Sequence, residues 1–146
     1  MSPAEVLKKY WGYDSFRPLQ EDIIDSVIKG EDVLALLPTG GGKSICFQVP
    51  AMVHSGLCIV VSPLISLMKD QVEQLQRRKI KAAAIYSGMS KKEIDITLDN
   101  CIYGDFKFLY VSPERLKTEL FQERAKQMNI NLLAIDEAHC ISQWGY

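Results

Sequence analysis

Five short apolar runs, separated by segments with helical spacing, constrain the fold of this 146-residue chain more than any other feature. The runs are residues 32–37, 57–61, 82–86, 106–111 and 132–135. Strands that are apolar along their whole length are typical of parallel sheets, because helices cover both faces of such a sheet. We therefore predict a single α/β domain with a mostly parallel sheet of about five strands and helices on both faces.

Local signals place helices between these runs. Ser2-Pro3-Ala4-Glu5 and Ser90-Lys91-Lys92-Glu93 have the pattern of capping boxes, in which a serine and a glutamate satisfy the first amides of a helix. Apolar residues spaced three and four apart from Leu19 to Ile28 predict a helix that Gly30 ends. Further helices are predicted over 43–53, around Met68 to Arg77, and from Pro113.

Composition excludes several classes of protein. Hydrophobic residues make up 47% and charged residues 24%, which is typical of a folded globular domain and argues against disorder or a coiled coil. We expect no membrane span and no signal peptide. The net charge of −1 neither supports nor excludes nucleic-acid binding. The four cysteines form no CxxC pair, so we expect reduced thiols in a cytosol-like compartment rather than a zinc site.

A glycine cluster lies between the first apolar run and the helix predicted over 43–53. It reads Leu37-Pro38-Thr39-Gly40-Gly41-Gly42-Lys43-Ser44. A strand, a glycine-rich loop and a helix in this order form a phosphate-binding loop, in which backbone amides and the helix N-terminus hold phosphate oxygens. Lys43 would reach the β- and γ-phosphates, and Ser44 would bind Mg²⁺. The alternative is a glycine-rich turn with a lysine at a helix start.

Two carboxylates follow the last apolar run. Asp136 and Glu137 come directly after residues 132–135, so they lie at the carboxyl end of a predicted strand. In a nucleotide hydrolase Asp136 would hold Mg²⁺ and Glu137 would orient the attacking water. A solvated strand end is the alternative for this pair alone. His139 does not have the HExxH spacing of a zinc protease.

Together these segments resemble the RecQ-type DNA helicases, a family with a DEAH box. Asp136-Glu137-Ala138-His139 and the following Cys140-Ile141-Ser142-Gln143-Trp144-Gly145 are similar to that box and to the start of the family's aromatic-rich loop. Residues 61–72 resemble motif Ia, residues 110–116 resemble motif Ib, and residues 12–20 resemble the adenine-recognition motif. The similarity extends over nearly the whole chain, in the order of the family's motifs.

The resemblance implies roles for three residues near the N-terminus. Tyr13 and Arg17 would sandwich the adenine ring of ATP, and Gln20 would hydrogen-bond its edge. Without the family, ordinary packing of the tyrosine and a surface charge on the arginine are the simpler interpretation. The cofactors implied are ATP and Mg²⁺, with Thr39, Gly40, Gly41 and Gly42 completing the phosphate site.

The resemblance also implies contacts with DNA. Ser62-Pro63 and Ser112-Pro113 each follow a predicted strand and are expected to open a helix, where they would contact the DNA backbone. His139 and Trp144 would couple DNA binding to ATP hydrolysis; packing is the alternative for the tryptophan. Seven basic residues between Lys69 and Lys92 either contact DNA or form a solvated helix face.

From the resemblance we expect residues 1–146 to be part of the first RecA-like motor lobe of an ATP-dependent 3′-to-5′ DNA helicase. The second lobe and the zinc-binding and winged-helix regions would be absent, and this chain alone would not unwind DNA. A cytoplasmic, nucleoid-associated location or a nuclear one would follow. A small P-loop kinase and a non-catalytic nucleic-acid-binding module are the competing hypotheses. A kinase would need a lid with arginines, and the five arginines of this chain form no obvious lid cluster. A binding module would leave Glu137 unexplained.

Overall fold

The computed structural model describes residues 2–17, 20–29 and 45–135. The chain divides into two compact units, residues 1–55 and residues 56–146, and each is described by itself. The predicted strand over 32–37, the glycine cluster and the DEAH segment lie outside the described residues. Within the described ranges, no helix is long and apolar enough to cross a membrane.

The first unit is helical in its described part. It contains α1 (Pro3–Val6), a π-helical turn η1 (Leu7–Trp11), α2 (Gln20–Ile28) and α3 (Ile45–Val53). The capping box predicted at Ser2 is confirmed, with the serine hydroxyl accepting from the Glu5 N–H at 3.2 Å. The helices pack through a small core whose fully or nearly fully buried members are Val6, Leu7, Ile24, Ile45 and Val49.

The second unit is built on a parallel sheet. Its strands are β1 (Leu57–Val61), β2 (Ala82–Ile85), β3 (Phe108–Val111) and β4 (Ile130–Ile135), in the order β2-β3-β1-β4. All three strand pairs are parallel. The fold class predicted from the apolar runs is therefore confirmed, with four of the five expected strands inside the described residues.

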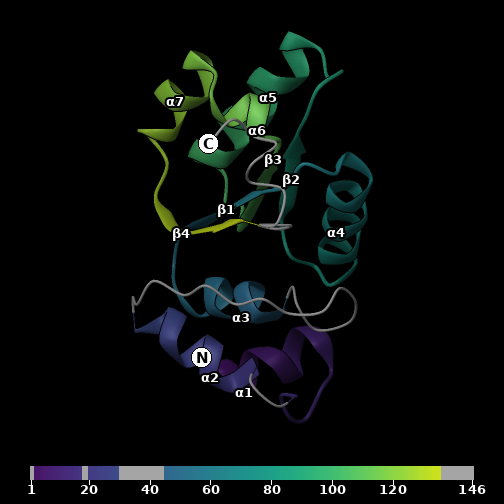
Figure 1. The fold of residues 1–146 in the computed structure, drawn as a ribbon, viewed down its shortest axis with the longest axis vertical. Helices are drawn as coiled ribbons and strands as arrows, with labels where there is room; N and C mark the ends of the chain where they lie inside the picture. The colour runs from purple at the N-terminus through teal and green to yellow at the C-terminus, as the bar shows by residue number, and fades with distance from the viewer. Residues whose placement is uncertain (1, 18–19, 30–44, 136–146) are drawn as a thin grey trace. The chain divides into compact units, whose positions relative to one another are not determined.

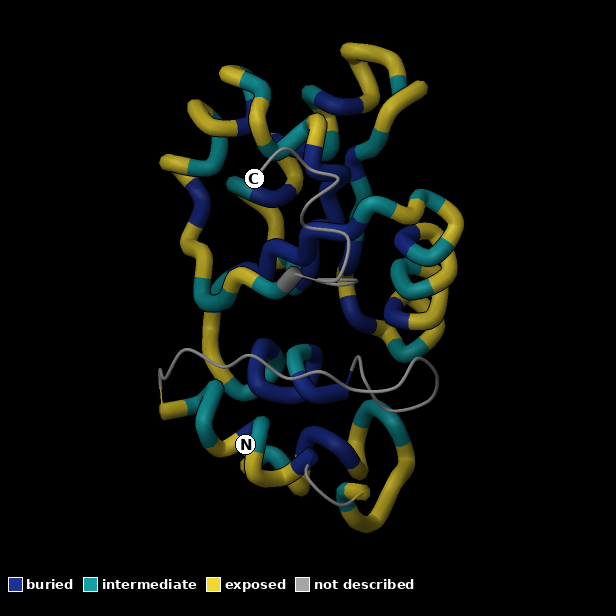
Figure 2. The backbone as a smooth tube through the Cα atoms, in the orientation of Figure 1, coloured by how far each residue is buried: buried dark blue, intermediate teal, exposed yellow. Residues whose placement is uncertain are grey.

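The two central strands are buried over their whole length, as the continuous apolar runs predicted (Figure 2). Side chains alternate between the two faces of the sheet. Leu57, Ile59 and Val61 join one core cluster with residues of α5 (Lys91–Tyr103) and α7 (Glu119–Ala125). On the other face, Tyr110 bonds to α4 (Ile65–Arg77), so helices cover both faces of this sheet.

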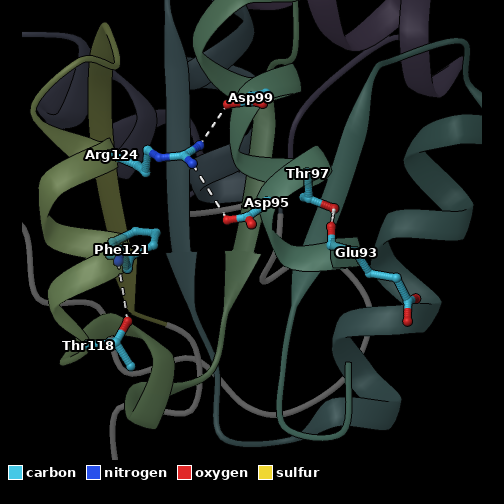
Figure 3. Close-up of polar contacts among 7 residues, drawn as sticks. All are labelled: Glu93, Asp95, Thr97, Asp99, Thr118, Phe121 and Arg124. Carbon is cyan, nitrogen blue, oxygen red and sulfur yellow. Dashed lines mark hydrogen bonds and ion pairs between the residues drawn. The ribbon is translucent and has the colours of Figure 1, made fainter. Parts of the chain in front are cut away.

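Figure 1 shows α4 on one side of the sheet and α5, α7 and the short α6 (Pro113–Leu116) on the other. The capping box predicted at Ser90 is confirmed at the start of α5, where the hydroxyl accepts from the Glu93 N–H at 3.1 Å. Arg124 of α7 reaches Asp99 at 2.6 Å and Asp95 at 3.5 Å, both on α5 (Figure 3). These ion pairs hold the two helices together at their solvent side.

Three strand boundaries differ from those predicted. β2 ends at Ile85 rather than at 86. β3 begins at Phe108 rather than at 106, because Phe106 packs against the core cluster instead of pairing in the ladder. β4 begins earlier than predicted, since Ile130 already pairs with Leu57 despite the polar Asn131 that follows it. β4 lies at one end of the order of the described strands. Residues 32–37, which were predicted to form a strand beside it, lie outside the described residues.

Three cysteines are described, Cys46, Cys58 and Cys101, and all are buried free thiols. Burial raises the pKa of Cys58 and of Cys101 to about 12. Cys58 and Cys101 are therefore protonated at neutral pH and act as small apolar side chains.

Lys107 donates from its ammonium group to the Gly56 carbonyl, next to the start of β1, at 3.3 Å. Burial lowers the pKa of this lysine.

Candidate nucleotide and nucleic-acid site

The predicted site residues divide between described and undescribed parts of the chain. Those outside the described residues are Thr39, Gly40, Gly41, Gly42, Lys43, Ser44, Asp136, Glu137, His139 and Trp144. Tyr13, Arg17 and Gln20 are described in the first unit, and Ser62, Pro63, Ser112 and Pro113 in the second. No cluster of three or more potential metal-ligating side chains occurs within the described residues.

The three adenine-recognition candidates lie just before and at the start of α2. Tyr13 is 52% exposed and Arg17 is also exposed, so both side chains can accept a stacking partner. Gln20 is buried, and its Oε1 accepts a hydrogen bond from the Arg17 N–H at 2.7 Å. The Gln20 N–H in turn donates to the Arg17 carbonyl at 3.1 Å. Gln20 therefore fixes the backbone that carries Arg17, a contact the sequence analysis did not anticipate.

The two Ser-Pro segments lie side by side at the carboxyl edge of the sheet. β1 and β3 are adjacent parallel strands in which Val61 faces Val111. The ladder continues beyond the strands, because the Ser62 N–H donates to the Val111 carbonyl at 3.0 Å. The Ser112 N–H likewise donates to the Ile85 carbonyl of β2 at 3.2 Å. Segments separated by 50 residues in sequence are thus brought to one edge of the sheet.

Ser112 opens a helix as predicted. Its hydroxyl accepts from the Arg115 N–H at 3.4 Å, and Pro113 occupies the first position of α6. Proline suits that position because its missing N–H would have no intrahelical partner there.

The prediction that Ser62-Pro63 opens a helix in the same way is wrong. α4 begins at Ile65 and its N-cap is Leu64. The Ser62 hydroxyl instead accepts from the Leu64 N–H at 3.3 Å, closing a tight turn between β1 and α4. This turn uses the serine and proline before the helix starts, so the first amides of α4 have no side-chain cap.

A bond between β3 and α4 further connects the two Ser-Pro segments. The Tyr110 hydroxyl donates to Oε1 of Gln71 at 2.6 Å. Gln71 follows Ser62-Pro63 on α4, and Tyr110 precedes Ser112-Pro113 on β3. Sequence reasoning missed this contact, because a tyrosine and a glutamine 39 residues apart give no local signal.

Several side chains of the basic segment have local partners. The Lys69 ammonium lies 4.8 Å from the centre of the Tyr86 ring, and Arg77 pairs with Glu73 on the same helix. The Arg78 guanidinium donates to the Gln74 carbonyl at 3.2 Å, in the last turn of α4. These contacts favour the interpretation of a solvated helix face with cations at its C-terminus.

The parallel sheet, with both Ser-Pro segments at its carboxyl edge, has the arrangement of open α/β domains that bind ligands beyond the carboxyl ends of their strands. The family model described as DEAD/DEAH box helicase matches residues 17–146. The chain therefore belongs to the DEAD/DEAH box helicase family.

Curated relatives confirm the resemblance to RecQ-type helicases. The chain is 46% identical over 143 residues to the probable ATP-dependent DNA helicase RecS of Bacillus subtilis, covering 97% of the chain and 28% of that protein. It is 47% identical over 141 residues to the ATP-dependent DNA helicase RecQ of Haemophilus influenzae, covering 97% and 23%. The RecQ of Synechocystis is 46% identical, with 99% and 30% covered. The chain thus spans less than a third of the length of these relatives.

Solved structures share the fold at lower sequence identity. The DUF1998 helicase MrfA, bound to DNA and AMPPNP, matches with a TM-score of 0.76 and 19% identity, over 95% of this chain and 21% of that one. A hypothetical ATP-dependent RNA helicase from Sulfolobus tokodaii matches with a TM-score of 0.71 and 20% identity, over 98% and 43%. At this identity the likeness concerns the fold.

Proposed function

We propose that this chain is the ATP-binding part of the first motor lobe of a RecQ-type, ATP-dependent 3′-to-5′ DNA helicase. The observation that carries the proposal is that the two Ser-Pro segments meet at one edge of the sheet, in a chain of the DEAD/DEAH box helicase family. Parallel α/β sheets bind ligands beyond the carboxyl ends of their strands, which is where these segments lie.

Adenine and phosphate recognition are assigned to two segments. Tyr13 and Arg17 are exposed and would stack on adenine, and the Gln20 amide would contact its edge. The amides from Thr39 to Gly42 would hold phosphate oxygens, with Lys43 balancing the charge of the β- and γ-phosphates. Because one segment would recognise adenine and the other the β- and γ-phosphates, the nucleotide bound would be ATP.

Hydrolysis is assigned to Ser44 and to the two carboxylates of Asp136 and Glu137. Glu137 would orient a water molecule and accept its proton as it attacks the γ-phosphate. Ser44 and Asp136 would hold Mg²⁺, since hydroxyl and carboxylate oxygens are the donors this ion prefers, and the ion would neutralise phosphate charge.

DNA contact is assigned to the carboxyl edge of the sheet. The first turn of α4 carries no acidic residue, and its amides have no side-chain cap. A helix N-terminus of this kind favours a phosphate group through its amides and its dipole. Ser112-Pro113 follows the neighbouring strand, so one DNA backbone would contact both segments. His139 and Trp144 would then transmit DNA binding to Glu137.

Unwinding is assigned to a longer protein of which this chain is one part. The RecQ and RecS relatives are three to four times its length, and their printed names describe ATP-dependent DNA helicases. A second lobe and the zinc-binding and winged-helix regions would complete that protein. Its place in the cell would be with DNA, in the bacterial cytoplasm or in a nucleus.

The kinase and the non-catalytic binding module are less well supported. The family match and the RecQ and RecS relatives all point to a helicase. A kinase would increase its turnover with a small acceptor, whereas a helicase motor responds to DNA and a binding module to neither.

The test of the nucleotide site is the affinity of the full-length protein for ATP, measured by titration calorimetry. Lys43→Ala should weaken binding at least about tenfold, because the triphosphate loses a positively charged partner. Lys92→Ala serves as the matched control, since Lys92 is an exposed lysine on α5. Equal ATP affinity of the Lys43 variant and the control would remove the phosphate-loop assignment.

A further inference from the structure

A cavity of about 370 Å³ lies beneath α5, beside the segment that follows β3. Its walls come from the end of β2, the first half of α5, α6 and the start of α7. Cavities of about 300–1,000 Å³ are the size class that holds small organic ligands. None of the described residues that line it belongs to the segments assigned above to ATP.

The floor of this cavity is apolar. Ile85, Leu98 and Phe121 line it, and each is buried as part of the main core cluster. An apolar floor favours a ligand with an aromatic or branched aliphatic body, because burying that body removes apolar surface from water.

Two cations, Lys91 and Arg115, also line the cavity. Lys91 is exposed at the first position of α5, and Arg115 is half-buried on α6. Among the residues that the structure describes, neither side chain forms an ion pair. A pair of cations at one apolar cavity selects a ligand that carries a negative group.

The other polar groups of the cavity are already committed. The Thr118 hydroxyl donates to the Arg115 carbonyl at 2.7 Å and accepts from the Phe121 N–H at 3.3 Å, a bond drawn in Figure 3. In the described part of the chain no carboxylate lines the cavity, and the nearby Glu93 bonds back to the Ser90 N–H at 3.2 Å. The two cations therefore remain to hold a ligand.

We propose that this cavity binds a small amphipathic anion, with an apolar or aromatic body against Leu98 and Phe121 and a carboxylate between Lys91 and Arg115. The proposal assigns a ligand site beyond ATP and DNA. It does not depend on the helicase activity, because both the cavity and its cations belong to described residues of the second unit.

The test uses 1-naphthoate as probe and the ¹⁵N-labelled 146-residue chain, followed by amide chemical shifts. Saturable shifts are expected at Ile94, Thr118 and Phe121, which line the cavity. The neutral analogue 1-naphthamide should bind about fivefold more weakly, since it lacks the charge that the cations attract. Absence of shifts at millimolar 1-naphthoate, or equal binding of the amide, would overturn the proposal.

Matched variants locate the anion. Lys91→Ala and Arg115→Gln should each weaken 1-naphthoate about three- to fivefold, the range expected for a partly exposed ion pair. Lys92→Ala removes a neighbouring exposed lysine that does not line the cavity, so it should leave the affinity unchanged. A uniform effect of all three variants would indicate non-specific attraction and overturn the site.

A cavity-filling variant tests the apolar part independently. Leu120 lines the cavity and is half-buried, so Leu120→Trp can fill the space without replacing a fully buried side chain. It should abolish 1-naphthoate binding while the circular dichroism spectrum and unfolding temperature stay near those of the wild type. Retained affinity in this folded variant would contradict the proposal.

Discussion

The Tyr110 hydroxyl on β3 donates a 2.6 Å hydrogen bond to Gln71 on α4, joining the two elements that carry the predicted DNA-contact segments. Tyr110 is fully buried. The contact fixes α4 against the sheet, because the tyrosine ring packs below the helix while its hydroxyl reaches the glutamine.

Tyr110→Phe should lower the free energy of unfolding by about 1 kcal/mol, the net value of one partly buried hydrogen bond. The ring and its packing remain, so the loss reports the hydroxyl alone. Urea denaturation measures it. Tyr103→Phe is the control, since Tyr103 is 79% exposed and should lose almost nothing. Equal stability of the two variants would show that the bond to Gln71 contributes no stability.

Arg124→Ala should destabilise the chain by about 1–2 kcal/mol, because Arg124 pairs with Asp95 and Asp99 and its side chain is only 25% exposed. Arg77→Ala removes an exposed pair within one helix and should cost at most about 0.5 kcal/mol. Raising the salt concentration should shrink the difference between the two variants. An Arg124 variant as stable as the Arg77 variant would contradict the account.

Gly56→Ala should be strongly destabilising, by more than about 3 kcal/mol. The glycine has φ +103°, and an added Cβ would lie 2.6 Å from the Asn129 carbonyl oxygen. That oxygen accepts the first hydrogen bond of β1, from the Leu57 N–H at 2.7 Å, so it has little room to move. Thermal unfolding of the variant measures the loss.

Gly88 is the matched control for this substitution. Its φ is +102°, but an added Cβ would meet nothing within 4 Å. Gly88→Ala should therefore cost only the backbone strain, about 1–2 kcal/mol. If both variants lost the same stability, the clash at Asn129 would be absent.

Stability should fall as the pH rises above about 9, partly through Cys101. Burial raises the pKa of this thiol from 9.0 to about 12. Between these values the unfolded chain releases the proton and the folded chain keeps it, so unfolding becomes more favourable as the pH rises. Each such thiol contributes a slope of at most about 1.4 kcal/mol per pH unit.

Comparison with Cys101→Ala isolates this contribution. The alanine leaves a small cavity, whose cost does not depend on pH, whereas the loss of the thiol removes its titration. Urea unfolding between pH 8 and 10.5 should therefore show a shallower decline for the variant. Parallel curves for the two proteins would mean that Cys101 titrates alike in the folded and unfolded chains.

Much of the second unit could be predicted from the sequence, because its signals are local. The apolar runs at 57–61 and 82–86 predicted strands, and the capping box at Ser90 predicted a helix start. The turn at Ser62 was misassigned, since a serine followed by proline fits both a helix start and a tight turn. Backbone geometry decides between them.

Contacts between distant residues could not be predicted. Arg124 bonds to residues 25 and 29 positions earlier, and β3 and α6 lie between the two helices, so no single periodic segment connects the partners. The cavity between β2, α5, α6 and α7 likewise depends on how four elements pack. For the candidate site, the order of the motifs indicated the family, and the structure added that Ser62 and Ser112 share one edge of the sheet.

The measurement that bears most directly on the helicase assignment is ATP hydrolysis by the full-length protein, with and without single-stranded DNA, in the wild type and in Glu137→Gln. We predict that DNA raises wild-type turnover at least about tenfold, and that Glu137→Gln binds ATP normally but hydrolyses it at least about a hundredfold more slowly. Turnover that ignores DNA, or a Glu137→Gln variant as fast as the wild type, would contradict the assignment.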